Sequence, residues 1–494
     1  MSADILSFII FLPAVVAFGL MITTKHVDTV RNIAFLTTTV ILALVLKIYI
    51  DFEPSAGMQF VTNVPWIESY GINYYIGVDG FSLTILMMIA ILIPTAYLLL
   101  WEGRTKGYWI NMLLVQTGVT GALLSLDVIL FYFFWEIMLL PVFLMIGIYG
   151  FGDKVFTTIK VTVYTMLGSL FMFVAILYLG VAYFNEFGNW SFQYDSLTQI
   201  TTLSYNEKIW LFLAFLSAFA IKIPIFPLHT WIMETYKNAP TGAVFLLSSI
   251  MAKLGVYAIV RFMIPIFPDI YVEFSTWFVF IGLFGLVYFG VAALMQDDIK
   301  RMLAYSSASH LSFIAAGIFS LNEFGINGAL YLIIAHAIAT GALFLLIGII
   351  HDETGLKTIK DLGGLAKQSP IFTTIFAVML FANIGLPGTN GFVSELLIIF
   401  GIYEFNHTLG YISALTVIIG ASYMLWMFQR AILVKRESGE DLKFRDLKIK
   451  EIIGLIPWVI LVFLMGIYPD IFMDKFEPTV THYLNDILHI GATK

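Results

Sequence analysis

Long apolar runs separated by short polar connections fill the whole chain. A helix that crosses a bilayer needs about 20 mostly apolar residues, and this pattern predicts fourteen such helices, with no connection long enough for a soluble domain. The expected fold is all-α, a polytopic membrane protein of about fourteen transmembrane helices. The runs lie near 4–22, 30–50, 78–101, 108–126, 127–150, 161–184, 209–233, 238–262, 273–295, 300–320, 327–350, 371–400, 409–432 and 452–473.

The composition supports the membrane assignment and excludes several kinds of chemistry. Of the 494 residues, 60% are hydrophobic and 12% charged, too few charges for the surface of a soluble protein. The chain has no cysteine, which excludes disulfides, thiolate zinc sites and cysteine-bound iron–sulfur clusters. No dinucleotide fingerprint or phosphate loop is present. We therefore expect no cofactor on this chain and no nucleic-acid partner.

The placement of lysine and arginine predicts the orientation. Odd-numbered connections between the runs carry 19 basic residues, whereas even-numbered connections and the termini carry five. Basic residues favour the cytoplasmic side. Both termini should therefore lie on the periplasmic side of a bacterial inner membrane.

An internal repeat divides the chain. Residues 126–150 align with 296–320 at an offset of 170, which brings Asp127 opposite Asp297. Each unit would hold five helices, so the second must be inverted, a hallmark of ion-transporting folds. The predicted parts are helices 1–3 in 1–107, a first repeat in 108–262, an inverted repeat in 263–432, and a cytoplasmic loop with the last helix in 433–494.

Ionisable residues inside the spans are the candidate functional site. Each costs about 2.5–3.5 kcal/mol in the hydrocarbon region, so they should face one another or water. Carboxylate, lysine and imidazole groups together can relay protons. The alternative for any one of them is a structural ion pair between helices, and the two histidines could in principle bind haem, although the small residues expected around a haem are missing. The six are Glu136, Lys222, Lys253, His310, His336 and Glu395.

Two spans contain helix-breaking residues beside a charge. Pro224 and Pro227 follow Lys222, and the run 383–395 has its own cluster of breakers ahead of Glu395. Proline removes a backbone donor, and in lipid a broken helix is tolerated only where protein or water satisfies the freed carbonyls. We predict polar, hydratable spots at mid-membrane, and His229 as a possible cytoplasmic entry point. The breakers of the second run are Gly385, Pro387, Gly388 and Gly391.

These segments closely resemble a known family. FFWEIMLLPVFLMIGIYG (133–150), AFAIKIPIFPLHTW (218–231), NAPTGAVFLLSSIMAKLG (238–255) and GLPGTNGFVSE (385–395) are similar to the antiporter-like membrane subunits of respiratory complex I, the NADH–quinone oxidoreductase. The chain is most similar to chain M, subunit 4 of mitochondria, because an acidic Glu395 follows LPGTNGF where sister chains usually carry lysine. One departure is Ile232–Tyr236, where the family usually reads Leu-Pro-Asp-Ala-His, and it puts the local entry route in doubt.

The resemblance implies roles and partners. Glu136 should pair with Lys222, Lys253 should link two half-channels, His310 and His336 should continue the axis, and Glu395 should end it. NAD, FMN, iron–sulfur clusters and quinone would be bound by partner subunits, among them sister antiporter-like chains. A subunit of a multi-subunit cation/proton antiporter, an equivalent chain of a membrane-bound hydrogenase, and a passive scaffold are the alternatives.

Overall fold

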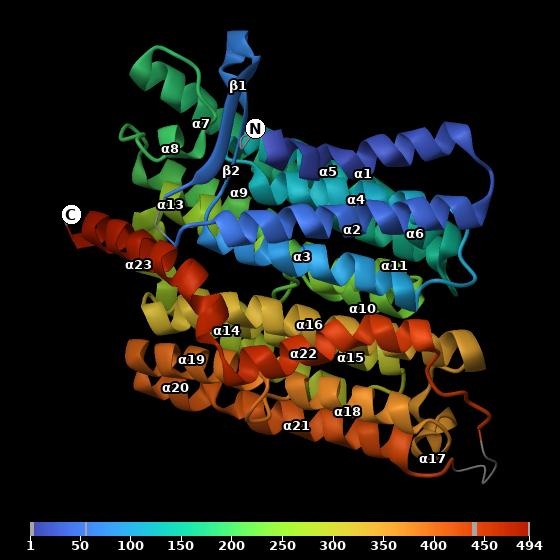
Figure 1. Ribbon diagram of the computed structural model, residues 1–494. Helices are drawn as coiled ribbons and strands as arrows, with labels where there is room; N and C mark the ends of the chain where they lie inside the picture. The colour runs from blue at the N-terminus through green and yellow to red at the C-terminus, as the bar shows by residue number, and fades with distance from the viewer. Residues whose placement is uncertain (1–3, 55–56, 437–441, 493–494) are drawn as a thin grey trace.

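The computed structural model describes residues 4–54, 57–436 and 442–492. It is an extended bundle of long helices that run roughly side by side in alternating directions (Figure 1). Both chain ends lie at one end of this bundle, together with a two-stranded hairpin, and we call this the hairpin end. The opposite end, at α17, is called the loop end.

The N-terminal part contains three helices and the hairpin. The connection 51–77, expected only as a loop, folds as β1 and β2, which pair antiparallel with Thr62 opposite Ile76. Asp79 directly after β2 caps the next helix by accepting a hydrogen bond from Ser82 N at 2.8 Å. The elements are α1 (Asp4–Thr23), α2 (Val27–Asp51), β1 (Gln59–Ile67), η1 (Glu68–Tyr70), β2 (Ile72–Val78) and α3 (Gly80–Leu99).

The predicted first repeat is helical, with one long interruption and two π-helical segments. The elements are α4 (Lys106–Leu124), α5 (Val128–Ile137), α6 (Leu139–Tyr149), α7 (Lys154–Phe187), α8 (Tyr194–Leu197), α9 (Tyr205–Lys222), α10 (Thr230–Asn238), α11 (Thr241–Phe245), η2 (Leu246–Met251), α12 (Ala252–Ala258), η3 (Ile259–Met263) and α13 (Ile264–Ile266). Helix α7 starts seven residues before the predicted span. Asp153 caps its N-terminus, and the first turns carry charged residues, so hydropathy alone did not include them in the span.

The predicted second repeat and the C-terminal part follow. The elements are α14 (Pro268–Leu294), α15 (Ile299–Ile318), α16 (Glu323–Thr354), η4 (Ile359–Asp361), α17 (Leu365–Gln368), α18 (Pro370–Asn383), α19 (Asn390–Phe405), α20 (His407–Ser413), α21 (Leu415–Phe428), η5 (Gln429–Leu433), α22 (Ile449–Ile467) and α23 (Asp470–Ala492). The sequence predicted one helix near 452–473, whereas the structure turns at Tyr468 and begins a separate helix, α23.

Each predicted run contains helix, and within the described residues ten spans are long and apolar enough to cross a membrane. The other four runs, 108–126, 209–233, 300–320 and 371–400, are helices that are interrupted or less apolar, so the number fourteen stays a prediction. The chain is a mostly helical, multi-pass membrane protein.

Matched details support the predicted repeat, which itself stays a prediction. Asp127 forms an isolated bridge with Gln193, and Asp298, the residue after the aligned Asp297, forms one with Thr358. Two π-helical segments, η3 and η5, lie 170 residues apart, which equals the offset of the sequence alignment.

Candidate functional site

The first break separates α9 from α10, and Lys222 is the last residue of α9. Pro224 has a positive φ of 29°, and Ile225 N reaches back five residues to Ala220 O at 2.9 Å. The carbonyl of Ile221 therefore loses its helical partner and accepts a hydrogen bond from Trp231 Nε1 at 2.9 Å. The protein thus satisfies this freed group, as a break in a membrane helix requires.

The second break, between α18 and α19, repeats this pattern. Leu386 N bonds Phe381 O at 3.0 Å, and Gly385 and Gly388 have positive φ angles of 68° and 91°. Pro387 has no N–H to offer the carbonyl four residues earlier, that of Asn383. The ring of His310 takes up this carbonyl instead, with Nε2 at 3.0 Å from Asn383 O.

The backbone hydrogen bonds of the first break recur in the second break at positions 161 residues later in the chain. Ile225–Ala220 corresponds to Leu386–Phe381, and Leu228–Ile225 corresponds to Thr389–Leu386. Pro224 then lies opposite Gly385. In this register Asn383 occupies the position of Lys222.

Four of the six predicted residues form a continuous buried series. Lys253 Nζ lies 2.8 Å from His336 Nδ1. The rings of His336 and His310 have centroids 5.4 Å apart, and His310 Nε2 lies 3.4 Å from Glu395 Oε1. Each of the four side chains is less than 5% exposed. The series crosses from α12 through α16 and α15 to α19, within the interior of the bundle.

The other two predicted residues lie beside this series without joining it. Lys222 Nζ lies 5.0 Å from the centre of the Trp135 ring. The Cβ of Lys222 packs against the backbone of Gly255, which is two residues from Lys253 in the sequence. Among the described residues, Lys222 Nζ and Glu136 Oε1 have no hydrogen-bond partner. The expected Glu136–Lys222 contact is therefore not an ion pair in this structure, because no pair between them falls within 4.0 Å. Glu136 is half-buried, and its Oε1 is enclosed within the bundle.

Glycines of the second break make room for Glu395. A Cβ on Gly385 would lie 2.9 Å from Glu395 Oε2. A Cβ on Gly391 would overlap the carbonyl of Ala382. The acid therefore sits directly against the broken backbone.

The sequence analysis missed a polar group around His310. Asn383 Nδ2 donates to Thr340 at 3.0 Å, Ser306 Oγ lies 3.4 Å from Asn383 Oδ1, and Ser306 also bonds Tyr423 at 3.0 Å. All four are buried. The sequence signal for this group was Asn383, an uncharged amide inside an apolar run. Such an amide is a weaker sign of a functional site than a charged residue.

His229 directly precedes α10, at the far side of the first break. Its ring packs on Phe289 at 4.7 Å between centroids and is 6% exposed, and its Nδ1 has no partner within the described part of the chain. Its role as an entry point stays a prediction. No group of three potential metal ligands occurs among the described residues.

Comparisons with known proteins show the family of the chain. The family model "NADH:quinone oxidoreductase/Mrp antiporter, TM" matches residues 125–420. NADH-quinone oxidoreductase subunit M of Rhodobacter capsulatus is 36% identical over 98% of this chain and 97% of the relative. NADH-ubiquinone oxidoreductase chain 4 of Marchantia polymorpha is 34% identical over 94% of this chain and 93% of the relative.

Among solved structures, a chain of respiratory complex I from Thermus thermophilus with bound NADH superimposes with a TM-score of 0.89. It is 28% identical, and the match covers 99% of this chain and 100% of that one. The matched region contains both breaks and all six candidate residues. The chain therefore belongs to the family of NADH:quinone oxidoreductase and Mrp-antiporter transmembrane subunits.

Proposed function

We propose that this chain is the proton-translocating chain M subunit of an NADH–quinone oxidoreductase. The observation that carries the proposal is the buried contact series from Lys253 through His336 and His310 to Glu395. Burying four ionisable groups in the hydrocarbon region costs free energy unless the groups pair with one another. Their order, base to imidazoles to acid, suits the movement of a proton.

In this proposal each group receives a proton from one neighbour and passes one to the next. The ammonium of Lys253 donates to His336 Nδ1, whose ring then hands a proton toward His310, and His310 Nε2 delivers it to the Glu395 carboxylate. Glu136 and Lys222 act ahead of this series, where Lys222 borders the helix that carries Lys253. The two groups approach and pair during the cycle.

The chain performs no redox step in this proposal. NAD, FMN, iron–sulfur clusters and quinone are bound by other subunits, and the energy arrives through neighbouring membrane chains. The proposed location is a bacterial inner membrane, with both termini and the hairpin end on the periplasmic side.

A cation/proton antiporter subunit is the second candidate, because the family description covers both kinds of complex. The acidic Glu395 at the end of the series favours the oxidoreductase. Sodium-dependent proton movement in vesicles without NADH would favour the antiporter instead.

The proposal is tested at Glu395. Glu395→Asp keeps a titratable acid, so NADH-driven proton uptake by membrane vesicles should survive in part. Glu395→Gln keeps size and hydrogen bonding but cannot carry a proton, so uptake should largely fail. Assembled complex is quantified in each variant. Near-normal uptake with Gln and loss with Asp would remove Glu395 from the proton path.

A further inference from the structure

Both ring nitrogens of His310 face oxygen atoms that can only accept hydrogen bonds. Nδ1 lies 2.9 Å from Ser306 O, and Nε2 lies 3.0 Å from Asn383 O. A neutral imidazole carries one N–H, so its other nitrogen would hold a lone pair against a carbonyl oxygen. Only the imidazolium donates from both nitrogens. Because both oxygens stand at hydrogen-bond distance, no water fits between them and the ring, and the geometry favours the charged form.

His336, the next ring of the series, has different partners. Its Nδ1 lies 2.8 Å from Lys253 Nζ, and its Nε2 has no partner among the described residues. One ring proton on Nε2 is sufficient for His336, because Nδ1 can then accept from the ammonium of Lys253. The contacts of the two histidines therefore differ in the number of protons they require, although the ring centroids are 5.4 Å apart.

Glu395 supplies a counter-charge for His310. Its Oε1 lies 3.4 Å from Nε2, whereas charge-assisted N–H···O bonds are about 2.7–2.9 Å long. Nε2 is closer to Asn383 O, at 3.0 Å, so the proton on Nε2 is hydrogen-bonded to the carbonyl and not to the acid. This proton thus lies beside a carboxylate that could accept it, but it is held by a carbonyl that cannot.

The side chain of Asn383 fixes the position of that carbonyl. Its Nδ2 donates to Thr340 on α16 at 3.0 Å, and its Oδ1 lies 3.4 Å from Ser306 Oγ on α15. Asn383 is the last residue of α18, and Glu395 belongs to α19. The two groups that compete for the proton therefore lie on opposite sides of the second break. A movement of α19 relative to α18 would change the distance from Nε2 to the acid and leave the carbonyl in place.

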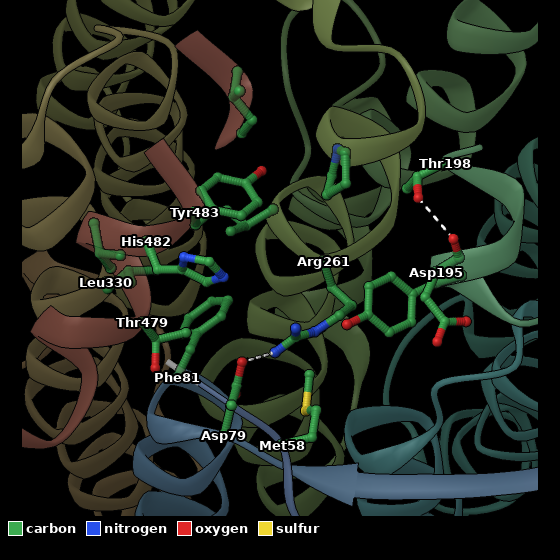
Figure 2. Close-up of a pocket in the computed structure, with 16 residues that line it drawn as sticks. Met58, Asp79, Phe81, Asp195, Thr198, Arg261, Leu330, Thr479, His482 and Tyr483 are labelled. Carbon is green, nitrogen blue, oxygen red and sulfur yellow. Dashed lines mark hydrogen bonds and ion pairs between the residues drawn. The ribbon is translucent and has the colours of Figure 1, made fainter. Parts of the chain in front are cut away.

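Another buried ion pair, Arg261 with Asp79, shows what a fixed contact looks like. It lies beside a cavity of about 650 Å³ at the hairpin end (Figure 2). There the guanidinium donates directly to the carboxylate, whose side chain is 1% exposed. Arginine keeps its proton in proteins, so this pair cannot transfer one. His310 differs in both respects, since its proton is donated to a backbone carbonyl and imidazole releases protons near neutral pH.

We propose that His310 holds the proton of the series as an imidazolium and that the Asn383 carbonyl gates its release to Glu395. The proposal rests on the proposed function and adds the regulation of its last step. When α19 brings the acid within hydrogen-bond distance, the Nε2–H bond breaks, its electron pair stays on the ring, and the proton forms an O–H bond on Oε1. Ring and acid both become neutral. Only then does Nε2 have a lone pair, so His310 accepts the next proton from the side of His336 after it has released the first.

The first test asks whether the ring is charged. His310→Gln and Glu395→Gln are made singly and together, and the temperature at which half of the detergent-solubilised complex unfolds is measured. Each single variant leaves one buried charge without its partner, whereas the double variant removes both charges. We therefore expect the double variant to lose less than the sum of the two single losses, which a double-mutant cycle detects.

The matched control replaces His310→Gln with His336→Gln in the same cycle. Because a neutral ring has no charge to pair with Glu395, the losses of His336→Gln and Glu395→Gln should add. Additive losses for His310→Gln and Glu395→Gln would mean that the ring of His310 is neutral, and they would overturn the proposal.

The second test asks whether the carbonyl gates the proton. Thr340→Val keeps the shape of the side chain and removes the acceptor of Asn383 Nδ2, so the carbonyl is less firmly fixed. We expect fewer protons moved per NADH oxidised in the assembled complex, because a proton released out of order can return to the ring. Thr120→Val is the matched control, since it removes a buried hydroxyl that donates to Gln116 O in its own helix, and it should keep the wild-type ratio. A wild-type ratio in Thr340→Val overturns the gate.

The outcomes separate this proposal from the proposed function. If Glu395→Gln pumps normally, the proton path through Glu395 is wrong, and the gate is wrong with it. If Glu395→Gln fails to pump while its losses with His310→Gln are additive, the series stands and the charged ring is wrong.

Discussion

At the scale of single residues, Asn383 is the feature of the site that charge did not reveal. It takes the position of Lys222 in the register of the two breaks, its carbonyl contacts His310, and its amide joins Thr340 and Ser306. An amide cannot carry a charge at this position, but it can hold a proton-carrying ring and its hydrogen-bonded neighbours in place.

Asn383→Leu should therefore lower the number of protons moved per NADH oxidised. The substitution keeps the backbone carbonyl and removes the bonds to Thr340 and Ser306, each loss costing about 1–3 kcal/mol where a buried group stays unpaired. Vesicle proton uptake and NADH oxidation are measured together. Asn327→Leu, at another buried asparagine in α16, serves as the control, and equal pumping by both variants would argue against a role for Asn383.

The Asp79–Arg261 pair makes a prediction about stability. Asp79→Ala leaves a buried guanidinium without its counter-ion, which typically costs 3–5 kcal/mol. Thermal inactivation of the detergent-solubilised complex should begin at a clearly lower temperature. Ser82→Ala removes a hydroxyl bonded to the same carboxylate but leaves the ion pair, at about 1 kcal/mol. Similar curves for the two variants would mean that the ion pair contributes little.

All six candidate residues of the relay could be found from the sequence because a charge inside an apolar run stands out at any position. Which of them touch could not be found, since contacts such as that of Lys253 with His336 join helices 83 residues apart.

At the scale of elements, the second helix break positions Glu395. Gly385 and Gly388 both have positive φ angles, so alanine strains the backbone at either, at about 1–2 kcal/mol. Only at Gly385 would the new methyl group meet the Glu395 carboxylate, since nothing lies within 4 Å at Gly388.

The pair separates strain from chemistry. Gly385→Ala should reduce proton uptake per NADH beyond what its stability loss explains, whereas Gly388→Ala should lose stability alone. Quantified assembly, thermal inactivation and vesicle uptake are compared for both. Should Gly388→Ala lose as much pumping as Gly385→Ala, backbone strain and not the contact with Glu395 governs this site.

The breaks themselves were predictable because proline and glycine act locally. The hairpin and α23 were not. Strand pairing of β1 with β2 depends on partners across a turn, and α23 mixes apolar and acidic positions that hydropathy alone averages away.

At the scale of the whole molecule, the chain carries most of its basic residues in the odd-numbered connections and places its termini at the hairpin end. Helical spans follow from apolar length, which the bilayer thickness fixes, and so their approximate positions were predictable. Side-by-side packing of α16 with α19 or α14 with α15 needs the folded chain.

Orientation in the membrane is the last prediction, and the roles of entry and exit depend on it. Two single-cysteine variants are made. One places the cysteine at Ser204, the exposed N-cap of α9 at the hairpin end. The other places it at Ser438 in the basic loop, a position that lies outside the described residues. Intact cells are treated with an impermeant thiol reagent. Because 19 basic residues favour a cytoplasmic loop end, position 204 should be labelled and position 438 protected until the membrane is opened. The reverse labelling would invert the chain and place the hairpin end on the cytoplasmic side.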